Sequence, residues 1–332
     1  VHDNQVLGYG LLGIGRLGLP LVTSIHHPVS VDRRIELEAA RGLARLGKRR
    51  WYAFVRMQGR VTHRVSRGGP ILTVSQSSRT DIINDFRAVP DSVKVIPLGV
   101  DTRLFYPRPA PRVSGRIVTV ASADSPMKGV TTLLRAFAAV AERDPVAHLI
   151  VVSKPTPGGP TDKLMGELGL AGRARFTHGM SNTELAELLA SAQLSVVPSL
   201  YEGFSLPAVE HMASGTPLVA SRTGALPEVT GEAAALVEPG DPDELAAVLT
   251  RLLGQPAERE QLGAAALRRV QERFAWPAVA RATVAQYRAT IGAPAMGHLS
   301  GQESPAVGHL SGQESPAVGH LSGQESKGAG PC

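Results

Sequence analysis

The sequence predicts an α/β protein built from two doubly wound parallel sheets. Short β-branched runs alternate with helical stretches, and a proline-bearing stretch, 97–111, separates the first runs from the others. Alternation of this kind is typical of parallel sheets that are covered by helices on both faces. The runs expected to form buried strands are 21–25, 71–74, 93–96, 117–120, 149–152, 194–197 and 218–220.

Amphipathic helices are expected between these strands, for example over 130–142, 182–192 and 243–253. Residues 33–67 interleave arginines with apolar side chains and also indicate amphipathic helix. Two interpretations of this basic stretch stay open: an ordinary solvated helical face, or a surface for anionic lipid or an acidic acceptor. We expect no nucleic-acid partner, because no recognition motif accompanies the charge.

We divide the chain into four parts: a partial N-terminal Rossmann-like domain over 1–107, a C-terminal Rossmann-like domain over 108–272, a C-terminal helix over 273–292, and a tail over 293–332. Only three predicted strands precede the linker, whereas a domain of this class usually has about six. We therefore expect the chain to begin inside a larger domain.

The tail repeats the eight residues that start at Gly297 from Gly308 and again from Gly319. It is rich in Gly, Ser, Pro and Gln and poor in large apolar residues, so we expect it to be disordered.

Bulk composition excludes disorder throughout, because 43% of the 332 residues are hydrophobic and 19% are charged. The single cysteine, Cys332, allows no internal disulfide and favours a reducing compartment. Neither a charged leader nor an apolar run of about 18 residues is found, so we expect a cytoplasmic protein, at most peripheral at the inner membrane face. The net charge is +6.

The segment 199–219 carries the chemistry, with the layout strand, loop, helix, strand. Ser205 suits a helix N-cap, Pro207 suits the first turn, and Gly215 ends the helix. The backbone N–H groups of residues 204–206 therefore lie at a helix N-terminus, which attracts phosphate and oriented hydroxyls. Glu202 and Glu210 bracket that end.

Glu202, Gly203, Phe204 and Glu210 resemble the E-x7-E signature of retaining GT-B glycosyltransferases of family 4. The resemblance extends in the expected order from Val1 to about Ile291 and includes 215–219, 224–229, 178–179, Ser75 and 96–101 with Phe105 and Pro107. It implies the GT-B fold, with an acceptor-side first domain, a nucleotide-sugar-binding second domain, and a last helix that returns to the first domain. It also implies transfer from a nucleotide-sugar donor to an acceptor hydroxyl with retention, without metal or other cofactor.

The resemblance also implies roles for single residues. Glu210 would accept hydrogen bonds from the nucleotide ribose, while Glu202, Gly203 and the N–H groups of Phe204, Ser205 and Leu206 would hold the donor sugar. Lys128 would bind the diphosphate and stabilise charge on the leaving group. The family usually carries Gly-Arg where this chain has Ser122 and Ala123, so that guanidinium is absent.

On the acceptor side, the strand 23–27 resembles the family strand that ends in a histidine. His26 is our candidate for that role, and His27 is interpreted as structural. The catalytic set is thus His26, Lys128 and Glu202.

Two further motifs are set aside. Gly8 and Gly13 each start a formal G-x-G-x-x-G, but neither follows a convincing strand and no helix fits before residue 21. Asp241-Pro-Asp243 is interpreted as a helix cap and not as a metal site. Two other functions stay open beside transfer: a GT-B sugar-nucleotide epimerase, and a non-catalytic remnant that only binds nucleotide.

Overall fold

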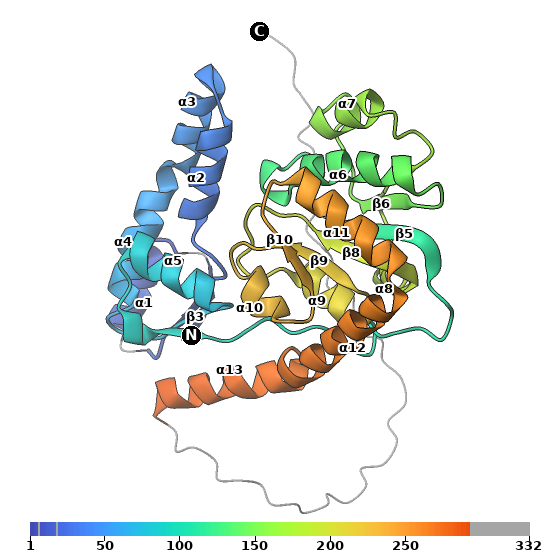
Figure 1. Ribbon diagram of the computed structural model, residues 1–332. Coiled ribbons are helices and arrows are strands. Elements are labelled where there is room, and N and C mark those ends of the chain that lie inside the picture. The colour runs from blue at the N-terminus through green and yellow to red at the C-terminus, as the bar shows by residue number, and fades with distance from the viewer. Residues whose placement is uncertain (6, 18, 293–332) are drawn as a thin grey trace, which may run out of the picture. The chain divides into compact units, whose positions relative to one another are not determined.

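The computed structural model describes residues 1–5, 7–17 and 19–292, which contain two parallel sheets (Figure 1). The first has the order β1-β2-β3-β4 and the second the order β10-β9-β8-β5-β6-β7. The strands are β1 His2–Asn4, β2 Val22–Ser24, β3 Ile71–Thr73, β4 Val93–Val95, β5 Val113–Val120, β6 His148–Val152, β7 Ala174–Thr177, β8 Ala192–Val197, β9 Leu218–Ser221 and β10 Ala235–Val237.

Helices connect these strands. They are α1 Gly10–Arg16, α2 Val29–Ala39, α3 Gly42–Trp51, α4 Val55–Val65, α5 Gln76–Phe86, α6 Val130–Arg143, α7 Pro160–Glu167, α8 Asn182–Ser191, α9 Leu206–Ala213, α10 Leu226–Thr230, α11 Pro242–Gly254, α12 Pro256–Arg273 and α13 Trp276–Ile291. Short 3₁₀ turns lie at Tyr52–Phe54 (η1), Pro90–Ser92 (η2) and Pro126–Lys128 (η3). Across the described ranges, no helix is both long and apolar enough to cross a bilayer.

The six-stranded sheet reverses its winding direction between β5 and β8, which are neighbours in the sheet although β6 and β7 lie between them in the chain. This is the doubly wound order, in which ligands bind beyond the carboxyl ends of the two strands at the switch point. The loops that follow β5 and β8 are therefore the places to look for a site.

Alternate residues of the central strands build two cores. Val118 and Ile150 face α8, α9 and α12, whereas Ile117 and Leu149 face α6 and α11. Such alternation places apolar residues on both faces of a sheet. The four-stranded sheet packs Ile25, Ile71 and Val93 against α1, α4 and α5.

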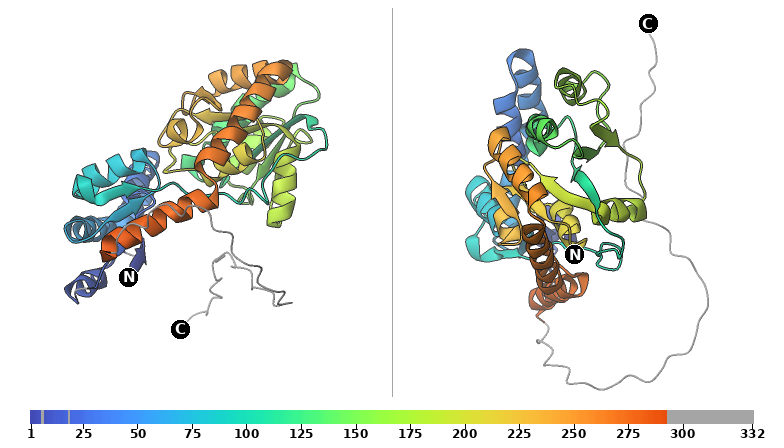
Figure 2. Two further views of the ribbon diagram at one scale, coloured as in Figure 1. Left: turned by 90° about the horizontal axis from the view of Figure 1, so that it is seen from below. Right: turned by 45° about the vertical axis from the view of Figure 1, so that its right-hand side comes forward.

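Helix α13 carries the chain back to the first sheet (Figure 2). The Tyr287 hydroxyl lies 2.7 Å from His2 Nδ1 in β1. At the start of this return, the Val100 N–H donates to the Phe274 carbonyl at 2.9 Å.

The predicted α/β fold class and all seven predicted strands are confirmed, each within a few residues. The interpretation that three strands precede the linker is wrong: β1 precedes them, so the first sheet has four. The glycine-rich opening was also misread, because α1 does fit between β1 and β2. The domain boundaries stay a prediction, and the predicted tail disorder concerns residues outside the described ranges.

The amphipathic helix expected over 33–67 is observed as three helices, α2, α3 and α4. The break falls at Ala40, whose backbone is extended, with φ −88° and ψ 143°. The apolar residues of this stretch follow no single helical stripe, since α3 buries none of its side chains while α4 buries five. The cap at Asp241 is confirmed, because its carboxylate accepts from the N–H groups of Asp243 and Glu244 at 3.0 Å.

Candidate active site

The loops beyond β5 and β8 bring Lys128 and Glu202 together. Lys128 Nζ donates to Glu202 Oε1 at 2.8 Å, and Ser199 Oγ donates to the same oxygen at 2.7 Å. The Glu202 residue is 9% exposed, so this carboxylate is held by two donors in a nearly buried position. A buried carboxylate of this kind is stable only because it is paired and hydrogen-bonded.

Two glycines allow this approach. Gly129, with φ 61°, follows Lys128, and a Cβ there would lie 1.9 Å from the Pro198 carbonyl oxygen. Gly224, with φ 51°, would place a Cβ 2.3 Å from the Glu202 carbonyl oxygen. Both positions combine a left-handed backbone with contact against main chain. A side chain at Gly129 would separate the loops beyond β5 and β8, and one at Gly224 would displace the loop after β9 from Glu202.

Helix α9 begins where the sequence predicts. Ser205 is the N-cap, and its Oγ accepts from the Ala208 N–H at 3.4 Å, although its own φ of 84° is unusual for a residue with a side chain. In the described part of the chain, the N–H groups of Phe204, Ser205 and Leu206 donate no hydrogen bond. They remain available to an anion or to sugar oxygens.

Glu210 lies one turn further along α9 and is not brought into contact with Lys128 or Glu202. Its side chain is half-buried, and burial raises the pKa of its carboxyl to about 7. It does not line the cavity that Lys128 and Glu202 line. Its predicted contact with a ribose stays a prediction.

His26 and His27 face the same region from the end of β2. The His26 N–H donates to Gln5 Oε1 at 3.0 Å, whereas the His27 ring bonds through Nε2 to Asp32 Oδ2 at 3.1 Å. Burial, followed by the nearby His27, lowers the pKa of His26. The lowered pKa favours the neutral imidazole, in which one ring nitrogen donates a hydrogen bond and the other accepts one.

A cavity of about 290 Å³ joins these groups. It contains every predicted site residue except Glu210. Its lining is His26, His27, Asp32, Val74, Leu98, Met127, Lys128, Tyr201, Glu202, Gly203, Phe204, Ser205, Leu206 and Pro207. Phe204 contributes mainly through its backbone, because its ring is buried and packs edge-on against Phe274 with centroids 5.7 Å apart. The arrangement offers the ammonium of Lys128, the carboxylates of Asp32 and Glu202, and a row of amides, the chemistry that binds a phosphate next to hydroxyl groups.

Several contacts at the cavity were not predicted from the sequence. Ser75 and Ser78 donate through Oγ to the Gly203 carbonyl at 2.7 and 3.1 Å. The Tyr201 hydroxyl donates to Asp81 Oδ2 at 2.7 Å. Ser75 and Tyr201 stand in or beside segments that the sequence singled out, but which atoms they contact depends on the three-dimensional arrangement.

Glu228 was also missed as a contact residue. Its carboxylate accepts from the Gln76 N–H at 2.9 and 2.8 Å, at the N-terminus of α5. Arg269 holds the backbone on the other side of Glu228, donating to the carbonyl oxygens of residues 228 and 229. A carboxylate at a helix N-terminus is stabilised by the helix dipole and by the unpaired N–H groups. Glu228 thus ties α10 to α5.

In the loop beyond β5, where the family arginine is absent, hydrogen bonds of Ala123 and Asp124 hold the backbone. Ala123 is buried and its N–H donates to Ser153 Oγ at 2.9 Å. Asp124, next to it, accepts from Thr156 and Thr161, and these hydrogen bonds hold the pKa of its carboxyl at about 2 against the opposing effect of burial. The loop beyond β5 is therefore braced internally, and Lys128 is its cation in the cavity.

Two family models match the chain: "Glycosyl transferases group 1" over residues 114–255 and "Glycosyltransferase Family 4" over residues 1–104. An MMP α-(1→4)-mannosyltransferase of Mycolicibacterium hassiacum is 53% identical over 295 residues, which cover 88% of this chain and 70% of that protein. A D-inositol 3-phosphate glycosyltransferase of Thermomonospora curvata is 35% identical, with 66% of this chain and 57% of that protein covered.

Solved structures agree in fold. A sucrose-phosphate synthase from Thermosynechococcus elongatus has a TM-score of 0.70 at 26% identity, covering 88% of this chain and 73% of that one. The Anabaena protein HepE, solved in complex with UDP-glucose, has a TM-score of 0.69 at 20% identity, covering 84% of this chain and 75% of that one. At that identity, the second likeness shows the fold alone.

Proposed function

This chain belongs to glycosyltransferase family 4, and from that premise we propose that it transfers a mannosyl group from a nucleotide-sugar donor to an acceptor hydroxyl with retention of configuration. The α-(1→4)-mannosyltransferase that is 53% identical supports the choice of sugar. The observation that carries the proposal is the meeting of Lys128 and Glu202 beside the available N–H groups of 204–206, at the switch point of the six-stranded sheet.

In this proposal, the Lys128 ammonium binds the donor diphosphate. The bond between the anomeric carbon and the phosphate oxygen breaks, and its electron pair stays on the phosphate. The acceptor oxygen bonds to the same face of the sugar, and its proton passes to the departing phosphate. Lys128 stabilises the charge that grows on that phosphate, an effect worth several kcal/mol in a partly dry site. No metal ion takes part.

Glu202 and the amides of 204–206 position the sugar. A carboxylate accepts hydrogen bonds from paired hydroxyls, and each bond to a charged group contributes about 1.5–3 kcal/mol. His26 lines the same cavity and orients the acceptor hydroxyl through its ring nitrogens. Glu210 binds the ribose. Positioning of both partners in one geometry supplies much of the rate enhancement.

We place the acceptor among anionic or lipid-linked molecules, and the protein in the cytoplasm with peripheral contact at the inner membrane face. The support for this is the basic stretch 33–67, whose helix α3 exposes basic and apolar side chains together.

Product analysis tests the proposed function. We expect the purified protein to convert GDP-mannose in preference to UDP-glucose. Conversion should require an acceptor from a panel of anionic and lipid-linked mannosides, and it should be equally fast in EDTA. The one-bond C–H coupling constant at the new anomeric carbon, measured by NMR, should identify an α-linkage. A β-linked product would contradict retention, and conversion of the donor without acceptor would indicate an epimerase.

A further inference from the structure

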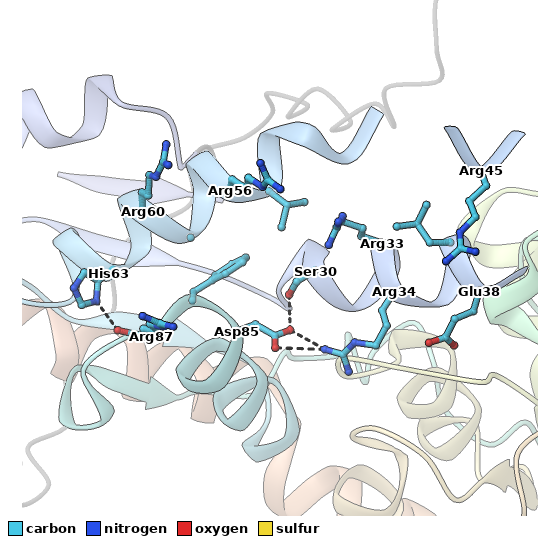
Figure 3. A pocket seen from close by; sticks show the side chains of 14 residues that line it. Ser30, Arg33, Arg34, Glu38, Arg45, Arg56, Arg60, His63, Asp85 and Arg87 are labelled. Carbon is cyan, nitrogen blue, oxygen red and sulfur yellow. Dashed lines mark hydrogen bonds and ion pairs between the residues drawn. The ribbon is translucent and has the colours of Figure 1, made fainter. Parts of the chain in front are cut away.

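A second, larger hollow of about 780 Å³ lies among α2, α3, α4 and α5. We call it the arginine hollow. Figure 3 shows that its labelled side chains come from these helices and from Arg87, directly after α5. Its lining is Ser30, Arg33, Arg34, Leu37, Glu38, Arg45, Val55, Arg56, Gly59, Arg60, His63, Asp85, Phe86 and Arg87. None of these residues lines the cavity of Lys128 and Glu202.

The charges of the arginine hollow are unbalanced. Six arginines and two acidic residues line it, which leaves an excess of four positive charges without counting His63. Asp85 is already engaged, because it accepts from Arg34 at 3.1 Å and from Ser30 Oγ at 2.6 Å. Among the ion pairs of the described residues, none involves any of the other five arginines, Arg33, Arg45, Arg56, Arg60 and Arg87.

These five arginines are of the residue type that binds phosphate groups, and they line one hollow. Arg56 and Arg60 lie four residues apart on α4, so they share one face of that helix. A guanidinium offers a planar fork of N–H donors that matches phosphate oxygens, and several forks around one hollow can engage one ligand from different sides. An anion in this position would also relieve the repulsion among like charges.

The floor of the hollow is apolar. Phe86 is 3% exposed and Val55 8% exposed. Gly59 leaves room for this floor, because a Cβ there would lie 3.3 Å from the Phe86 ring. The hollow therefore offers contact area for an uncharged part of the ligand as well as for its phosphate.

We propose that the arginine hollow is a binding site for a phosphate-bearing ligand, separate from the donor cavity. Two sources of such a phosphate fit the surroundings. One is a soluble phosphorylated molecule. The other is the headgroup of an anionic lipid, because α3, which contributes Arg45, also exposes Leu43 (87%), Leu46 (63%) and Trp51 (74%). Basic and apolar groups exposed on one helix are typical of a surface that meets lipid.

A charge-matched pair of variants tests this site. The first variant, Arg56→Gln with Arg60→Gln, removes two guanidinium groups from the hollow. The control, Arg64→Gln with Arg67→Gln, removes the same charge from exposed positions at the end of α4 that do not line it. Thermal unfolding and calorimetric binding of the nucleotide sugar should be alike in both, which separates this test from the proposed transfer function.

Two probes distinguish the sources of phosphate. Inorganic pyrophosphate is titrated into each variant in a Lys128→Ala background, so that the donor cavity does not supply its cation. Vesicles of phosphatidylcholine, with and without phosphatidylglycerol, are cosedimented with each variant at fixed ionic strength, since salt screens exposed charges.

We expect the hollow variant to lose about tenfold or more in affinity for at least one probe, since each charge-assisted hydrogen bond contributes about 1.5–3 kcal/mol, while the control stays within about twofold of its parent. Loss toward pyrophosphate indicates a soluble ligand, and loss toward phosphatidylglycerol vesicles alone indicates a lipid headgroup. The proposal is overturned if neither probe binds the parent protein, or if both double variants bind both probes equally.

Discussion

The cavity lined by Lys128 and Glu202 differs from the arginine hollow in how its charges are paired. In the cavity, the ammonium of Lys128 meets the carboxylate of Glu202 at 2.8 Å, and Ser199 completes the carboxylate's hydrogen bonds. In the hollow, five arginines face one space without a carboxylate partner among the described residues. The charges of the cavity are thus paired with each other, whereas the charges of the hollow are balanced by a ligand. Substitutions in the two regions should therefore differ in what they affect.

The largest effect is expected at Lys128. Lys128→Ala should lower turnover by about 10²-fold or more, the scale seen when one group that stabilises developing charge is lost. Steady-state kinetics with saturating donor measure it. Lys154→Ala, which removes an exposed lysine from the loop after β6, serves as the control and should leave turnover unchanged. Normal turnover in Lys128→Ala would remove this lysine from the mechanism and leave its pairing with Glu202 as structural.

A smaller effect is expected at Glu210, the predicted site residue outside the cavity. Glu210→Ala should weaken nucleotide-sugar binding by about tenfold, which corresponds to about 1.4 kcal/mol, because a carboxylate that accepts from ribose hydroxyls is lost. Isothermal titration calorimetry measures it. Unchanged affinity would mean that the cavity lined by Lys128 and Glu202 is the whole donor site.

The pH dependence of stability gives an independent control on Glu210. Burial raises the pKa of this carboxyl to about 7, whereas its unfolded value is about 4.3. The folded state thus binds more protons between these values, so the free energy of unfolding falls as pH rises through this window and the loss is complete above it. In urea unfolding, the fall in the free energy of unfolding across this window should be smaller in Glu210→Gln than in the parent protein by about 1 kcal/mol or more. Glu187→Gln, at an exposed position on α8, should show the same fall as the parent.

The smallest effect is expected at Glu228, which caps α5 from α10. Glu228→Ala should lower the free energy of unfolding by about 1 kcal/mol, because the Gln76 N–H loses its acceptor. Urea unfolding measures the change, and the exposed Glu232→Ala is the matched control. If both variants unfold at the same midpoint, the tie between α10 and α5 contributes nothing measurable to stability.

Much of the fold was predictable because buried parallel strands leave strong local signals. The β-branched runs at 117–120 and 194–197 mark the two strands of the switch point, and the Ser205, Pro207 and Gly215 positions mark the ends of α9. The short edge strands β1, β7 and β10 escaped, since three or four residues at a sheet edge carry little periodicity. The basic stretch is helical as expected, but its division into α2, α3 and α4 could not be predicted, because helical periodicity does not indicate where one helix stops and the next begins.

The sequence predicted which segments carry the candidate site residues, but not the contacts between those segments. Glu202, Lys128 and His26 stand in motifs that follow strands, and the topology brings them to one cavity. The contacts that hold this cavity, such as Ser75 with Gly203 and Tyr201 with Asp81, join residues more than a hundred positions apart. No local pattern specifies such pairs, because they depend on the register of two sheets that fold from separate segments.

Because Lys128 and Glu202 are paired with each other, a ligand that binds in the cavity must replace the partner of both side chains at once. An anion that takes the ammonium leaves a nearly buried carboxylate with one donor fewer, which is costly. A ligand that carries hydroxyl groups next to its phosphates satisfies both partners in one step, whereas a bare inorganic anion satisfies one. We therefore expect the pair to discriminate against simple salts and to favour molecules in which a sugar and a diphosphate are joined.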